Sequence, residues 1–252
     1  MATLLWKELT EQWRSYRLPI VAAVLAAFGI MGPLSAKYLP LMLAEMPGVP
    51  EGLAEFMPQP DAALALGEYL DNLSQFGMIL AILIPMAAVV GEKSVGTVEI
   101  TLSKPVSRAA FLGAKFVANG ITLGAGVFLA AVGGFYYTGV LFTWPPLGAF
   151  AAANALVFAY LLLFVALTLF ASTLARSQLA AAGMSFGMLL GMGLLGAIPS
   201  LAPRLPAAVL GWARALALGA PADAGWSALA VCLVLIGAAL LASWLIFRRQ
   251  EL

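Results

Sequence analysis

Six long apolar runs separated by polar segments dominate the chain. They lie near residues 18–36, 73–91, 116–138, 147–174, 179–201 and 226–247. An α-helix needs about 20 residues to cross the hydrocarbon of a bilayer, and each run approaches or exceeds that length. The runs are continuously apolar and do not alternate with polar residues, which favours helices over the strands of a barrel. The pattern predicts an all-α integral membrane protein with six transmembrane helices in a single domain, residues 1–252.

A different pattern precedes the first run, in residues 1–17. Apolar residues recur there at helical spacing with charged residues between them: Leu5, Leu9, Trp13 and Tyr16. This spacing predicts an amphipathic helix that lies in the headgroup plane, with Trp6 and Trp13 as membrane-interface anchors. The alternative is an ordinary juxtamembrane extension of the first span.

Lysine and arginine indicate the orientation. With the N-terminus in the cytosol, three of the 13 basic residues lie outside: Lys37, Arg204 and Arg214. The other ten lie in cytosolic segments: Lys7, Arg14, Arg17, Lys93, Lys104, Arg108, Lys115, Arg176, Arg248 and Arg249. The opposite topology would reverse this ratio, so the positive-inside rule predicts that both termini are cytosolic.

Two segments are then expected outside. Residues 40–72 carry six carboxylates at irregular spacing, which predicts a solvated loop and fits no calcium-binding pattern. Residues 200–225 are semi-apolar and broken by prolines, which predicts one or two short helices at the outer surface. Whether they dip back into the membrane is left open by the sequence.

Composition narrows the function. Hydrophobic residues make up 63% of the chain and charged residues 10%, and the net charge of +1 provides no basic field for nucleic acid. There is no histidine, no phosphate-binding Gly-x-x-x-x-Gly-Lys-Ser/Thr motif, and no charged residue in the central part of any predicted span. We therefore predict no catalytic, cofactor or metal site. Mid-span polar residues such as Asn119 and Asn154 fit interhelical hydrogen bonds better than a substrate site.

The cytosolic loop 92–112 carries the most specific motif. It reads Glu92-Lys-x-x-Gly96-Thr97-x-Glu99-x-x-Leu102-x-x-Pro105-Val-Ser-Arg108, followed by Leu112-x-x-Lys115. This motif resembles the cytosolic signature of the membrane subunits of type-2 ATP-binding-cassette (ABC) exporters. The opening Trp6-Lys-Glu-Leu9 looks like the interfacial helix of the same family. The order of interfacial helix, six spans and long first external loop extends the resemblance over the whole chain.

The resemblance implies a non-catalytic permease in the plasma membrane, the inner membrane of a prokaryote. Two ABC ATPase subunits, which bind ATP and magnesium, would pair with two permeases, either two copies or a copy and a paralogue. The loop after the second span would be the coupling element. Its candidate residues are Glu92, Gly96, Val98, Glu99, Leu102, Pro105 and Arg108. Members of the family serve very different substrates, so the substrate does not carry over.

Two other classes of function remain as alternatives. A stand-alone carrier or channel is disfavoured by the lack of mid-span charge, and an intramembrane enzyme by the lack of histidine and intramembrane carboxylates. In the fifth run Gly183, Gly187 and Gly191 are spaced by four and would form one smooth helical face. That face predicts either a contact between two permeases or close packing within one chain.

Overall fold

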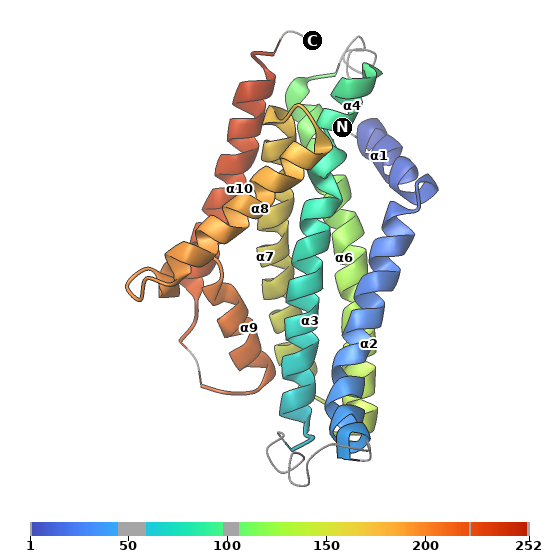
Figure 1. The fold of residues 1–252 in the computed structure, drawn as a ribbon, viewed down its shortest axis with the longest axis vertical. Coiled ribbons are helices and arrows are strands. Elements are labelled where there is room, and N and C mark those ends of the chain that lie inside the picture. Colours follow the sequence, from blue (N-terminus) through green and yellow to red (C-terminus); the bar gives the residue numbers. More distant parts are fainter. Residues whose placement is uncertain (1, 45–58, 98–105, 222, 251–252) are drawn as a thin grey trace.

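The computed structural model describes residues 2–44, 59–97, 106–221 and 223–250, and within these ranges it is helical without strands. The helices stand side by side as an elongated bundle (Figure 1). Their bounds are α1 Ala2–Arg14, α2 Arg17–Ala44, α3 Ala62–Leu83, η2 Pro85–Ala87, α4 Val90–Val95, α6 Arg108–Leu141, α7 Leu147–Leu174, α8 Gln178–Gly196, η3 Ala202–Arg204, α9 Ala208–Ala217 and α10 Trp226–Phe247.

Among the described residues, six helical stretches are long and apolar enough to cross a membrane, which confirms the predicted membrane fold. They are Arg17–Leu43, Ala62–Val95, Arg108–Leu141, Leu147–Leu174, Gln178–Gly196 and Trp226–Phe247. The second stretch is interrupted at Pro85, where the helix tightens into η2 before α4. Proline cannot donate the backbone hydrogen bond that a continuous helix needs, so the chain bends there.

Two helices begin well before the apolar runs that predicted them. The α3 helix starts at Ala62 because Asp61 caps it, its carboxylate accepting from the backbone N–H of Leu64 at 2.7 Å. The α6 helix starts at Arg108 because the Ser107 hydroxyl accepts from the N–H of Ala110 at 3.1 Å. Such caps satisfy backbone donors in polar sequence, where hydropathy gives no signal. The expected solvated loop 40–72 is therefore wrong at both ends, because residues 40–44 belong to α2 and residues 62–72 belong to α3.

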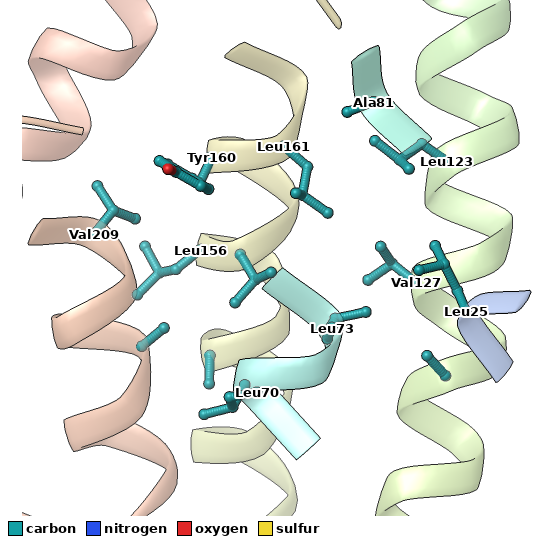
Figure 2. Packing of buried hydrophobic residues seen from close by; sticks show 14 of the residues in the cluster. Leu25, Leu70, Leu73, Ala81, Leu123, Val127, Leu156, Tyr160, Leu161 and Val209 are labelled. Atoms are coloured by element: carbon teal, nitrogen blue, oxygen red, sulfur yellow. The ribbon is translucent and has the colours of Figure 1, made fainter. Parts of the chain in front are cut away.

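The core runs between the upright helices. Figure 2 shows Leu73 of α3, Leu123 of α6 and Leu161 of α7 within this packing, and all three side chains are fully buried. Val209 of α9 joins the same cluster from the other side of α7. The α9 helix thus packs into the bundle and buries one face, Val209, Ala213 and Ala217. Arg214 on the same helix pairs with Asp71 of α3 at 2.9 Å.

Burial is uneven around the bundle. In the most apolar 18 residues of α7, 67% are buried, whereas only 17% are buried in the corresponding stretches of α8 and α10. In Figure 1 α8 leans away from the upright helices. This leaves a large apolar flank that only lipid or another protein can cover. The α1 helix, α4 and the C-terminal end of α10 all lie at the same end of the bundle (Figure 1).

Candidate coupling site

Lys115 is the buried centre of a charged cluster at this end of the bundle. It lies two turns inside α6, and only 3% of its side chain is exposed. Its ammonium group is 3.1 Å from both carboxylate oxygens of Glu8 in α1 and 2.7 Å from Oε1 of Glu92 in α4. A buried charge is tolerated only when it is paired and hydrogen-bonded. Lys115 therefore ties α1 and α4 to α6.

The α1 helix is held by its polar side. Its buried residues are Glu8 and Gln12, one turn apart. The Gln12 amide nitrogen donates to Asn119 Oδ1 at 3.3 Å, and the Thr122 hydroxyl donates to Gln12 Oε1. Asn119 in turn donates to the carbonyl of Lys115 at 2.7 Å. The matching spacing on α1 and α6 places polar groups opposite each other, and this confirms an interhelical role for Asn119.

The aromatic residues of α1 face the other way. Trp6 and Trp13 are 74% and 63% exposed, and Tyr16 is exposed as well. Indole rings prefer the boundary between hydrocarbon and headgroups, so this orientation suits a helix at the membrane surface. Their role as interface anchors stays a prediction.

Lys7 joins the charged cluster from its outer side. Its ammonium is 3.2 Å from Glu92 Oε1, 3.5 Å from Glu8 Oε1 and 3.9 Å from Glu11 Oε2. Burial alone would lower the pKa of Lys7, but the three carboxylates outweigh it and raise the pKa above its ordinary value. The carboxylates of Glu8, Glu11 and Glu92 are close enough to share a cation, and the ammonium groups of Lys7 and Lys115 lie among them. A metal ion would have to displace both.

The charged cluster borders a polar cavity of about 270 Å³ between α1, α4, α6 and the start of α8. Glu92 lines it, and the second carboxylate oxygen of Glu92 is buried without a hydrogen-bond partner among the described residues. The cavity thus lies directly beside Glu92.

The α4 helix is also fastened to the end of α7. The Ser172 hydroxyl accepts from the N–H groups of Val89 and Val90, both at 3.1 Å, and donates to the carbonyl of Met86 at 2.9 Å. The ammonium of Lys93 donates to the carbonyl of Thr173 at 2.7 Å. These bonds satisfy backbone groups freed by the break at η2. They connect α4 directly to the most buried helix of the bundle.

The coupling residues that the structure describes lie around this site. Glu92 is in the charged cluster. Gly96 ends α4 in a left-handed turn with φ of 74°, a conformation that glycine adopts without strain. Arg108 begins α6, and its guanidinium donates to the carbonyls of Phe247 and Gln250 at 2.5 and 3.0 Å, which links α6 to the end of α10. Four further candidates lie outside the described residues: Val98, Glu99, Leu102 and Pro105.

The predicted glycine face runs along α8. A Cβ atom added at Gly183, Gly187 or Gly191 would meet no described atom within 4 Å. The alternative of close packing within one chain therefore has no support among the described residues. The contact between two permeases stays a prediction.

Sequence reasoning missed the roles of Glu8 and Lys115. Both belong to the motifs that carry the family resemblance. The spacing in residues 1–17 marks Glu8 only as one of the charged residues between the apolar ones, and hydropathy places Lys115 in a cytosolic segment before the third span. The signal that could have found them is the pair of polar stripes, Glu8 with Gln12 and Lys115 with Asn119. Each has the four-residue spacing that puts two side chains on one helical face.

The fold defines a multi-pass membrane protein, with the charged cluster at the end of the bundle where α1 and α4 meet α6. The chain belongs to the ABC-2 family transporter proteins, whose family model matches residues 2–252. It is also similar to the "Uncharacterized transmembrane protein YxlG" of Bacillus subtilis (strain 168), with 29% identity over 255 residues that cover 100% of this chain and 98% of the relative. The chain is thus a membrane component of an ABC transporter.

Proposed function

We propose that the chain is the non-catalytic permease of an ABC exporter, driven by a separate ATPase that docks on the loop 92–108. One observation supports this most strongly. Glu8 of the N-terminal motif, Glu92 at the start of the loop motif and Lys115 at its end meet in one buried ion-pair network. Residues from two separate motifs, on the three helices α1, α4 and α6, therefore meet in one charged cluster.

The residues on either side of 98–105 would transmit a movement of the loop to the helices of the bundle. On one side the chain leaves α4, which Ser172 fastens to α7 and Glu92 to the charged cluster. On the other side it enters α6 at Arg108, which is bonded to the end of α10. A displacement of the loop by a docked ATPase would act on α1, α6, α7 and α10 together. Such coupling requires that the loop contacts the ATPase differently in its two states.

The proposed assembly has two ATPases, which bind ATP and magnesium, and two permeases. The open glycine face of α8 is the proposed contact between permeases, because small residues let two helix backbones approach closely.

In the proposed orientation both termini and the charged cluster are cytosolic. The charge asymmetry of the sequence supports this orientation, and α1, α4 and the C-terminal end of α10 share one end of the bundle.

A double substitution in the loop tests the docking role. Glu99→Lys with Leu102→Asp reverses one charge and adds another in an apolar position, while the basic residues that set orientation are kept. We expect normal membrane insertion, weaker co-purification of the ATPase and loss of permease-stimulated ATP hydrolysis. Glu51→Lys with Leu53→Asp is the matched control, since it makes the same two changes in the segment between α2 and α3. Unchanged association and stimulation in a correctly inserted loop variant would refute the docking role of this loop. No association of an ATPase with the unaltered permease would instead favour a stand-alone carrier.

The orientation is tested separately with single cysteines in a Cys232→Ala background. Ser103→Cys and Gln250→Cys should be shielded from a membrane-impermeant thiol reagent in intact cells and react after the membrane is opened. Gln59→Cys should react in intact cells. Labelling of the cysteine at position 103 from outside would overturn the proposed topology.

A further inference from the structure

An apolar cavity of about 560 Å³ lies between α6 and α7, in the half of the bundle near the turn that joins them. Its volume falls within the roughly 300–1,000 Å³ that is typical of ligand pockets. It lies at the other end of α6 from the charged cluster, so the proposed coupling does not use it. It opens sideways, with Phe128, Val132 and Leu147 among its exposed lining residues.

Small side chains make the cavity. Ala151 and Ala155 are one turn apart on α7, and Ala131 and Gly124 lie opposite on α6. Where these residues are small the two helix surfaces leave a trough, and larger side chains such as Phe128 form its rims. An open apolar trough of this size on the flank of a membrane protein is covered by lipid or by another protein.

The one amide that lines the cavity is engaged elsewhere. Asn154 Oδ1 accepts from the hydroxyl of Tyr69 on α3, and its nitrogen donates to the carbonyl of Phe150 at 2.9 Å. The rest of the lining is apolar, apart from the hydroxyl group of Tyr136 and the indole N–H of Trp144. A polar ligand would find few partners on the walls, so the cavity suits a hydrocarbon chain.

The depth of the cavity matches one leaflet of a bilayer. From Leu147 to Phe158 the lining extends over eleven helical steps of α7, about 16 Å at 1.5 Å per residue. This is roughly half of the 30 Å hydrocarbon core. Tyr136 and Trp144, 54% and 58% exposed, lie at the shallow end with ring centroids 6.4 Å apart. Tyrosine and tryptophan mark the headgroup boundary, so the cavity runs from that boundary towards the midplane.

We propose that this cavity binds one acyl chain of a phospholipid from the leaflet at the α6–α7 turn. The aromatic pair would lie at the level of the glycerol backbone and the trough would hold the chain along α7. Van der Waals packing is the driving force, because bulk lipid tails are as apolar as the walls and offer no hydrophobic gain. This site depends on neither the ATPase nor the direction of transport.

Native mass spectrometry in a mild detergent tests the proposal by counting phospholipids retained on each chain. We expect about one retained phospholipid on the unaltered protein and a several-fold lower occupancy on Ala155→Trp, whose indole would fill the trough. Ala152→Trp is the matched control, because Ala152 is an exposed neighbour on α7 that does not line the cavity. Its occupancy should equal that of the unaltered protein.

Three results would overturn the proposal. The unaltered protein could retain no phospholipid, or Ala155→Trp could retain as much as Ala152→Trp. Alternatively, Ala155→Trp could separate the permease into single chains at unchanged lipid content, which would make the cavity a contact between copies. If the tryptophan variant does not fold, Ala155→Leu and Ala152→Leu form the same comparison with a smaller side chain. Added phospholipid should then raise the melting temperature of Ala152→Leu more than that of Ala155→Leu.

Discussion

Replacing Lys115 by methionine should destabilise the protein more than the loss of any exposed cation. Methionine nearly preserves the side-chain volume but leaves the carboxylates of Glu8 and Glu92 buried without their shared partner. Removing one member of a buried ion pair costs about 3–5 kcal/mol. Lys7 remains 3.2 Å from Glu92 and compensates in part, so we expect about 3 kcal/mol.

Thermal unfolding of the purified permease in detergent measures this effect. About 3 kcal/mol corresponds to a fall in melting temperature of roughly 6–12 °C for a chain of this size. Arg14→Met is the control, because it removes the same charge from an exposed position on α1 and should change the melting temperature by about 1 °C or less.

A second substitution separates the ion pair from simple packing. In Lys115→Met with Glu8→Gln, one of the two stranded carboxylates is neutralised, so part of the lost stability should return. Additive effects of the two substitutions would mean that Glu8 and Lys115 do not interact in the folded protein. A melting temperature of Lys115→Met equal to that of Arg14→Met would refute the buried cluster altogether.

Three shorter predictions concern other parts of the chain. Tyr69→Phe removes the donor to Asn154 Oδ1 and should cost about 1–3 kcal/mol in thermal unfolding, unless water replaces the hydroxyl. Gly96→Ala should cost about 1–2 kcal/mol at φ 74° and reduce ATPase stimulation, whereas Gly96→Asn, which tolerates this turn, should be milder in both assays. Gly187→Leu should shift the solubilised complex towards single permeases, measured by light scattering, and Gly148→Leu, also in open surroundings, should not; a dimeric Gly187→Leu would exclude the α8 contact.

The fold was predictable because lipid imposes a simple rule on sequence. A segment that crosses hydrocarbon must be apolar and helical, so six apolar runs identify six helices. The helix starts at Ala62 and Arg108 were less accessible, since Asp61 and Ser107 cap the helices in polar sequence beyond the runs. The left-handed turn at Gly96 is a local feature, and glycine is the residue that adopts a φ of 74° without strain.

The charged cluster was not predictable in the same way. Glu8 and Lys115 are 107 residues apart, and no local pattern relates them. Hydropathy places Lys115 in the loop because it directly precedes the apolar run 116–138. In the structure it lies within α6 and its charge is buried. The polar stripes on α1 and α6 hold the information, but only their pairing in three dimensions identifies α1 as a helix that packs through its polar side.

The separation between Glu8 and Lys115 also sets an order for biogenesis. The α1 helix is synthesised first, but the groups that satisfy Glu8 and Gln12 enter the membrane only with α6. Until then Glu8 and Gln12 lack the partners that α6 provides. The α1 helix therefore cannot make its native contacts until α6 is in place. A ribosome stalled before residue 108 would carry α1 still accessible to protease, and protection would begin only after α6 has been released and inserted.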